Sequence, residues 1–133
     1  MTVVDASAVV DLLIPPDTRR RDWMIDALPE PTDPWLAPDI LTFEVFAVVR
    51  RHALRGALLP AAVWQRLQRL ERLPIDMLPT WPLLSDAWAL RDNLSAADSL
   101  YVALALRFGR PLLTSDLRLA RAAEAAGIDV RVP

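Results

Sequence analysis

The segment Thr2–Ile14, TVVDASAVVDLLI, carries three residues of strand character that lead almost directly into a helical pattern. Thr2–Val4 is short, β-branched and apolar, which is typical of a buried strand. From Ala6 onward, apolar side chains recur at helical spacing until Pro15 and Pro16 end the helix. A strand that passes into a helix in this way is the first half of a βαβ unit, and such units build parallel sheets.

The same alternation of strand and helix continues to the end of the chain. It predicts an α/β fold with a parallel sheet of about five strands and helices on both faces. With 133 residues and no linker-like segment, residues 1–133 are expected to form a single domain. The further strands are predicted at 35–37, 74–78, 111–114 and 128–132, and the further helices at 17–28, 39–55, 60–73, 83–93, 95–108 and 116–126.

The composition excludes several classes of protein. Apolar residues make up 53% and charged residues 24%, which is typical of a folded globular chain. No run reaches the roughly 18 apolar residues of a membrane span, so no membrane partner is expected, and the start of the chain lacks the basic region of a signal peptide. The absence of cysteine removes disulfides and thiolate metal sites, and together these features indicate a cytoplasmic protein. The net charge of −2 gives no overall basic field for nucleic acid, and all 15 basic residues are arginine.

Four of the 17 acidic residues differ from the others in their surroundings. Asp5 and Asp116 follow predicted strands, so both lie at the carboxyl ends of strands, where parallel sheets bind ligands. Glu44 has apolar neighbours within one helical turn on either side. Asp98 shares a helix face with Tyr101, Val102 and Ala105, the face that is expected to be buried. A buried carboxylate is costly unless it is hydrogen-bonded, paired or bound to a metal. Alternatives remain open: Asp5 and Asp116 also suit helix N-caps, Asp98 also suits the S-x-x-D capping box that starts at Ser95, and Glu44 also suits an exposed helix flank.

In a doubly wound sheet, these four carboxylates can converge at one edge. Close carboxylates repel each other in a low dielectric, and a divalent cation relieves that repulsion. The chain has no cysteine and only one histidine, His52, which is expected on the surface, so the ligands would all be oxygens. Oxygen ligands favour Mg²⁺ or Mn²⁺, and these ions catalyse phosphoryl transfer by activating water. The polar side chains that are predicted to hold metal-bound waters or to orient the carboxylates are Ser7, Asn93, Thr114 and Ser115.

These motifs resemble the PIN-domain ribonucleases, and closely the VapC toxins of bacterial toxin–antitoxin pairs. The resemblance extends over nearly the whole chain. It is carried by VVDASAVV at 3–10, the glutamate of TFEVFAVVRR at 42–51, NLSAADSLYVALA at 93–105 and LLTSDLRLA at 112–120.

The resemblance implies a PIN-like fold and a specific activity. It implies an endoribonuclease that depends on Mg²⁺ or Mn²⁺ and cuts structured RNA such as tRNA. It also implies a homodimer and inhibition by a cognate VapB antitoxin. The family's acidic metal ligands fall on Asp5, Glu44, Asp98 and Asp116, and its supporting polar positions fall on Ser7, Asn93 and Thr114.

An acidic site binds RNA when cations neutralise it and basic side chains outside it contact phosphates. The tryptophans are expected mainly in the core or at a protein interface, with Trp64 and Trp88 packed in helical apolar stripes and Trp23 in contact with the antitoxin. The candidates for phosphate contact, each of which is alternatively an ordinary solvated arginine, are Arg19, Arg20, Arg21, Arg50, Arg51 and Arg55.

Two other enzyme classes also place an aspartate after the first strand. Phosphatases of the haloacid-dehalogenase type require D-x-D and a lysine, and phospho-receiver domains also require a lysine. This chain reads Asp5-Ala6-Ser7 and contains no lysine, so both classes are excluded. The alternative that remains is a catalytically inactive module of the PIN fold that binds RNA or protein.

Overall fold

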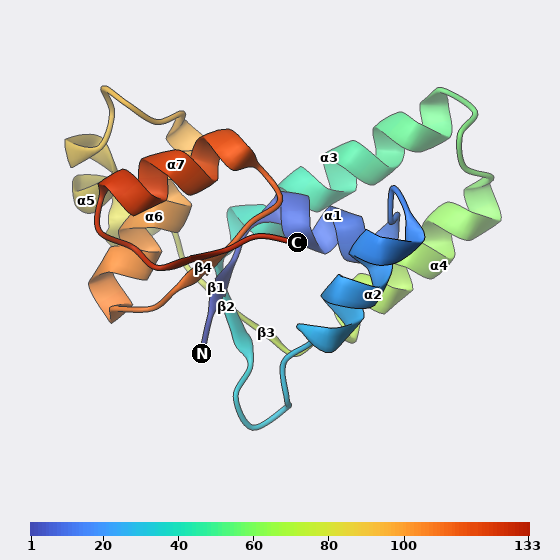
Figure 1. Ribbon diagram of the computed structural model, residues 1–133. Coiled ribbons are helices and arrows are strands. Elements are labelled where there is room, and N and C mark those ends of the chain that lie inside the picture. The colour runs from blue at the N-terminus through green and yellow to red at the C-terminus, as the bar shows by residue number, and fades with distance from the viewer.

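A five-stranded parallel sheet forms the centre of the computed structural model, which describes residues 1–133 (Figure 1). The strands lie in the order β3-β2-β1-β4-β5, and every neighbouring pair is parallel. The predicted α/β fold with about five parallel strands is therefore confirmed. The strands are β1 (Val3–Val4), β2 (Trp35–Pro38), β3 (Ile75–Leu78), β4 (Leu112–Leu113) and β5 (Val130–Arg131).

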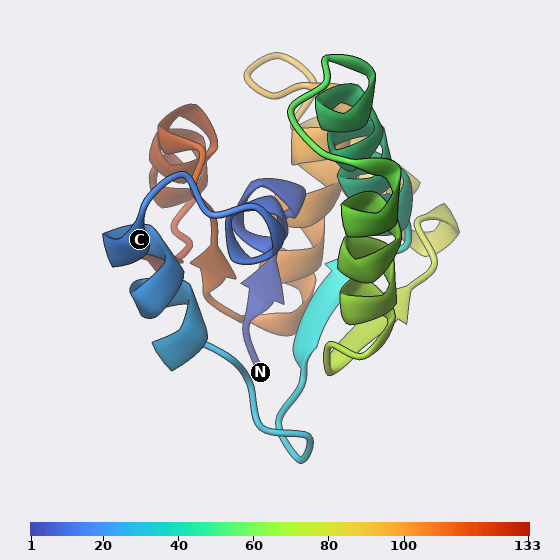
Figure 2. The same ribbon diagram turned by 90° about the vertical axis from the view of Figure 1, so that its right-hand side faces the viewer.

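Helices cover both faces of the sheet. From β1 to β3 the chain moves in one direction across the sheet, and from β3 to β5 it moves back, so right-handed crossovers place the two sets of helices on opposite faces. Figure 1 shows α1–α4 on one side and α5–α7 on the other, and Figure 2 looks onto the first group. None of these helices combines the length and the apolarity that a bilayer span requires. The helices are α1 (Ala6–Leu13), α2 (Thr18–Asp26), α3 (Ile40–Leu54), α4 (Pro60–Glu71), α5 (Leu84–Ala89), α6 (Ala96–Phe108) and α7 (Leu117–Ala125), with a 3₁₀ turn, η1 (Trp81–Leu83), before α5.

Strand β1 lies at the point where the strand order reverses. Val3 pairs with Leu36 of β2 on one side and with Leu112 of β4 on the other. Both segments that follow β1 and β4 therefore leave the sheet at the same edge. In open parallel sheets this is the place where ligands bind.

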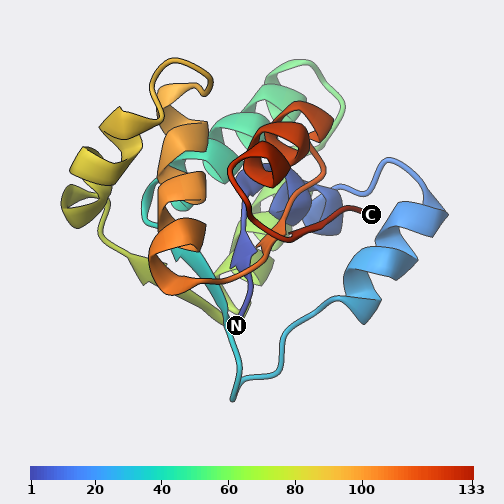
Figure 3. The same ribbon diagram turned by 60° about the vertical axis from the view of Figure 1, so that its left-hand side comes forward.

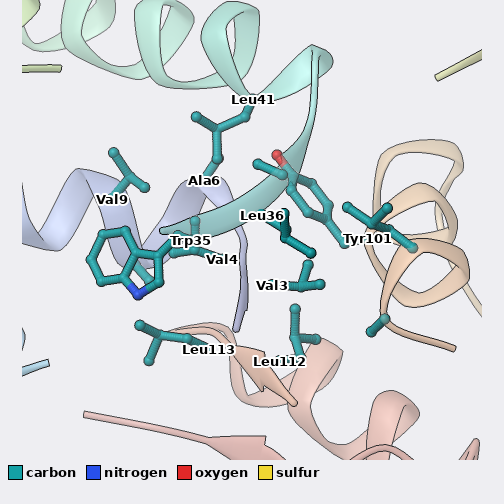
Figure 4. Close-up of a cluster of buried hydrophobic side chains, with 14 of the residues drawn as sticks. Val3, Val4, Ala6, Val9, Trp35, Leu36, Leu41, Tyr101, Leu112 and Leu113 are labelled. Atoms are coloured by element: carbon teal, nitrogen blue, oxygen red, sulfur yellow. The ribbon is translucent and has the colours of Figure 1, made fainter. Parts of the chain in front are cut away.

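The core consists of apolar side chains from the central strands and the helices next to them. Val3, Val4, Leu112 and Leu113 are at most 2% exposed, as expected for strands that are covered on both faces. Figure 4 shows the Tyr101 ring within this cluster, with its hydroxyl oxygen directed toward the start of α3. The core thus fixes α6 and α3 relative to the edge of the sheet where the acidic residues lie.

Two packing predictions for tryptophan are wrong. Trp64 is 57% exposed and Trp88 is 68% exposed, although both have helical apolar spacing. Such spacing shows which side of a helix is apolar, but it does not show that another element covers that side. Trp35, in contrast, is buried in β2.

A conformational test of the fold is available at the end of α6. Gly109 adopts a left-handed φ of 59° there, and its N–H caps the last turn of the helix. A Cβ at this position meets nothing within 4 Å, so Gly109→Ala costs backbone energy only. We expect its free energy of unfolding to fall by about 1 kcal/mol, measured by chemical denaturation. The neighbouring Arg110→Ala, at an ordinary φ, should change the free energy little, and equal values for the two variants would contradict the cap.

Candidate active site

Four carboxylates from separate parts of the chain line one cleft of about 530 Å³. Asp5 follows β1 directly, and Asp116 follows β4 after two intervening residues. Glu44 lies in the second turn of α3, and Asp98 lies in the first turn of α6. The structure therefore brings together the four acids that were predicted to converge, while their role as metal ligands stays a prediction.

Asp5 is the most buried of the four, with 6% of its surface exposed. Its Oδ1 accepts hydrogen bonds from the Ser7 hydroxyl at 2.8 Å and from the Ala8 N–H at 3.3 Å, so it caps α1. Burial raises the pKa of Asp5 to about 6, although these hydrogen bonds act in the opposite direction. The N-cap alternative thus holds for Asp5, and it is compatible with a place in the cleft.

A hydroxyl network joins the segments that follow β1 and β4. Ser7 Oγ donates to Asp5 and lies 3.2 Å from Thr114 Oγ1, so Thr114 supplies the hydrogen of that second bond. Ser7 Oγ also accepts from the Ser115 N–H at 2.9 Å, and Thr114 Oγ1 accepts from the Asp116 N–H at 3.0 Å. Three of the four predicted supporting residues therefore link Asp5 to Asp116. The Ser115 hydroxyl itself is buried without a partner.

A buried tyrosine holds Glu44 from the other face of the sheet. Tyr101 of α6 is 1% exposed, and its hydroxyl donates to Glu44 Oε1 at 2.7 Å. Burial, together with the hydrogen bond and the charge of Glu44, raises the pKa of Tyr101, so Tyr101 stays a donor. Burial also raises the pKa of Glu44, the charge of Asp98 adds to this effect, and the Tyr101 hydrogen bond opposes it.

Asp98 forms only half of the predicted capping box. Ser95 Oγ accepts from the Asp98 N–H at 3.1 Å, but the reciprocal bond from the Ser95 N–H to the Asp98 carboxylate is not formed. The carboxylate lines the cleft instead. Burial raises the pKa of Asp98 and the charge of Asp116 adds to this effect, whereas Ser95 and Arg118 lower the pKa.

The donor types of this cleft fit a hard divalent cation. All four side chains are carboxylates, and none of them forms an ion pair with a basic side chain. No three acidic or histidine side chains are arranged to hold one ion together, however. Binding of one ion by three or more of these carboxylates would therefore require them to move closer together.

The predicted phosphate-binding arginines occupy different surroundings. Arg51 lines the acidic cleft, beside the carboxylates. Arg20 lies 3.0 Å from Asp11, which also lines the cleft, so this arginine is already paired. Arg21 pairs with its exposed neighbour Asp22. Arg19, Arg50 and Arg55 are exposed and form no ion pair.

Sequence reasoning misplaced or missed several residues near the site. Asn93, the fourth predicted supporting residue, does not line the acidic cleft but a neighbouring groove, together with Arg118. Asp11, a fifth acid of the cleft, was not predicted, although it lies one helical turn after Ser7 in α1. Arg118 was also missed, and its position two residues after Asp116 was the available signal.

Comparison with known proteins places this geometry in a family. The sequence pattern of the PIN domain matches residues 2–125. This chain belongs to the PIN-domain family. Ribonuclease VapC3 of Mycobacterium tuberculosis is 42% identical to it over 120 residues, which are 90% of this chain and 85% of the relative. VapC ribonuclease Mb0985 of Mycobacterium bovis is 34% identical over 125 residues, which are 94% and 93% of the two chains.

Two solved structures of other proteins share the fold. VapC20 of Mycobacterium tuberculosis, described as a sarcin–ricin loop cleaving toxin, superimposes with a TM-score of 0.72 at 16% identity and covers 100% of both chains. FitAcB of Neisseria gonorrhoeae superimposes with a TM-score of 0.69 at 22% identity, and the match covers 98% of this chain and 96% of the FitAcB chain. The PIN-domain match and the VapC ribonuclease relatives confirm the family assignment made from the sequence motifs.

The raised pKa of Asp5 makes the stability of this PIN domain depend on pH. The folded state holds the Asp5 proton up to about pH 6, whereas the unfolded chain releases it near 3.8. In metal-free buffer the free energy of unfolding should therefore fall as the pH rises from about 4 to about 6, by about 3 kcal/mol at about 1.4 kcal/mol per pH unit. Denaturant titrations across this range measure the slope. Asp5→Asn keeps the acceptor for Ala8 and should have a smaller slope, with the remainder due to Glu44 and Asp98, whose pKa values are also raised; an equal slope in both proteins would contradict the assignment.

The Tyr101–Glu44 hydrogen bond can be tested with two substitutions of opposite effect. Tyr101→Phe removes the donor, so the pKa of Glu44 should rise and the free energy of unfolding should fall by about 1–2 kcal/mol. Asp98→Asn removes a nearby negative charge, so the pKa of Glu44 should fall. NMR titration of the Glu44 carboxyl group measures both shifts. A Glu44 pKa that is unchanged in Tyr101→Phe would show that the hydrogen bond is not formed in solution.

Proposed function

We propose that this protein is a Mg²⁺- or Mn²⁺-dependent endoribonuclease that acts as the toxin of a type II toxin–antitoxin pair. The observation that carries the proposal is the cleft in which Asp5, Glu44, Asp98 and Asp116 lie together without an ion pair. Relatives named VapC ribonucleases support the reaction type. The substrate that we propose is structured RNA such as tRNA.

The residues of the chain take separate roles in this hydrolysis of a phosphodiester bond. A divalent cation, when bound, would lower the pKa of a water molecule and stabilise negative charge on the phosphate. The side chains that would hold the cation are the carboxylates of Asp5, Glu44, Asp98 and Asp116. Tyr101 restrains Glu44 through its hydroxyl, and the Ser7 network fixes the Asp5 carboxylate relative to the segment that contains Asp116.

The proposal includes protein partners and a cellular location. We propose a cognate VapB-type antitoxin, a homodimer, and action in the cytoplasm with no membrane partner. Large apolar side chains at the surface support protein partners, because Phe43, Trp81 and Trp88 are 72%, 82% and 68% exposed. Trp23, the predicted antitoxin contact, is half-buried against the core and leaves only part of its ring available.

A catalytically inactive PIN module is the competing function. Such a module has no need for four acids in one cleft, because their mutual repulsion costs stability and contributes nothing to phosphate binding. Intact acids therefore favour the enzyme. The two functions differ in whether RNA that is bound is also cut.

Replacement of a single carboxylate discriminates between the two functions. Wild type should cleave tRNA with Mg²⁺ or Mn²⁺ and stop when EDTA is added. The cleavage rate of Asp98→Asn should fall by more than roughly 100-fold. Loss of an outer-shell partner costs roughly 10–100-fold in activity, and here a direct ligand is removed. Gel analysis of end-labelled RNA measures both rates. The matched control is Asp92→Asn, an exposed acid outside the cleft, which should cleave like wild type.

Stability measurements keep this test interpretable. Without a cation, Asp98→Asn should melt at the same temperature as wild type or higher, because one repelling charge is gone. A folded Asp98→Asn that still cleaves at the wild-type rate would sink the catalytic role of Asp98. Binding of RNA by wild type without any metal-dependent cleavage would favour the inactive module.

A further inference from the structure

A second groove, with a volume of about 580 Å³, lies beside the acidic cleft. One wall is the loop before α6, which contributes Asn93 and Leu94, and the other is α7, which contributes Arg118 and Arg121. The remaining lining residues are Ala122 and Ala125 of α7 and its C-cap Ala126, whose short side chains leave the groove open. Figures 1 and 3 show this loop and α7 at the same end of the molecule.

The two arginines of the groove are available to an external anion. They are three residues apart in α7, so they project from the same face of the helix. Both are exposed, and neither guanidinium forms an ion pair or donates a hydrogen bond within the protein. Arg107, by comparison, contacts both Asp86 and a backbone carbonyl. A planar guanidinium without a partner matches the geometry of a phosphate group.

Arg118 connects the groove to the acidic cleft. The backbone N–H of Arg118 donates to Asp116 Oδ1 at 2.8 Å, and the charge of its side chain lowers the pKa of Asp98, so this residue borders two of the four acids. An RNA strand with its reactive phosphate in the cleft has to continue beyond the cleft on either side. The groove offers such a strand positive charge directly next to the acids.

We propose that the groove formed by Asn93, Arg118 and Arg121 binds the phosphate backbone of the RNA substrate next to the bond that is cut. This inference rests on the proposed ribonuclease function. Arg121 and Arg118 contact phosphates, and the Asn93 amide contacts a sugar or a base edge. The groove therefore contributes to substrate binding and not to the chemical step.

Binding of RNA to Arg121→Ala tests the groove. The probe is fluorescein-labelled unfractionated tRNA, added with Mg²⁺ to proteins that also carry Asp98→Asn, so that binding is measured without cleavage. We expect Arg121→Ala to weaken affinity on the order of tenfold and to reduce the slope of log affinity against log salt by about 0.7–0.9. Arg121→Lys should restore the salt slope but only part of the affinity, because lysine is charged but not bidentate.

The matched control is Arg110→Ala. Arg110 is also an exposed arginine, but it precedes β4 and lies in a groove at the opposite end of the strands. This variant should bind the labelled tRNA with the affinity and salt slope of the Asp98→Asn parent. Circular dichroism confirms that each variant is folded. In an otherwise wild-type chain, Arg121→Ala should raise KM for cleavage and leave kcat unchanged.

The outcomes separate this inference from the proposed function. If Arg121→Ala and Arg110→Ala have equal affinities and salt slopes while wild type cleaves RNA, the inference about the groove is wrong and the proposed ribonuclease function stands. Wild type that neither binds nor cleaves RNA overturns the proposed function, and the inference with it. If Arg121→Ala weakens binding of the antitoxin and not of RNA, the groove binds an acidic protein segment and the inference is wrong.

Discussion

The burial of carboxylates at one edge of the sheet is the constraint on which the rest of this structure depends. Asp5, Glu44 and Asp98 all have raised pKa values because burial removes water from their charged forms. No basic side chain forms an ion pair with them. The packed core has to offset this cost, and carboxylates without a basic partner are the groups that would bind the proposed divalent cation.

Two sets of hydrogen bonds hold Asp5 and Glu44 in place at this edge. The Ser7–Thr114 contact joins the segments after two neighbouring strands, β1 and β4. The Tyr101–Glu44 bond joins α6 and α3, which lie on opposite faces of the sheet. Asp98 and Tyr101 are one turn apart on α6, so a single buried helix supplies one acid and positions another. Hydrogen bonds of this kind orient the carboxylates that would hold a cation.

The fold could be predicted from the sequence because its signals are local. A strand followed at once by a helix recurs along the chain, and this order alone assigns each acid at a strand end to an edge of the sheet. The Tyr101–Glu44 bond could not be predicted, since it depends on how two helices from opposite faces approach each other. The exposure of Trp64 and Trp88 was missed for the same reason, because apolar spacing does not specify the element that covers it. The separation of Asn93 from the acidic cleft depends on the path of one loop.

The distribution of charge over the surface, and not the net charge of −2, determines where a polyanion could bind this protein. The acids that make the chain negative are partly gathered in one cleft, where a bound cation would reverse their effect on a phosphate. Arg51 lines that cleft, and Arg118 and Arg121 line the adjoining groove. A phosphate in the groove would lie next to Arg118 and Arg121. Salt at physiological concentration screens charges beyond about 8–10 Å, so acids farther away than this have little effect on such a phosphate. An acidic protein can bind RNA in this way without any broad basic surface, and its affinity then depends on a few arginines whose removal is measurable one at a time.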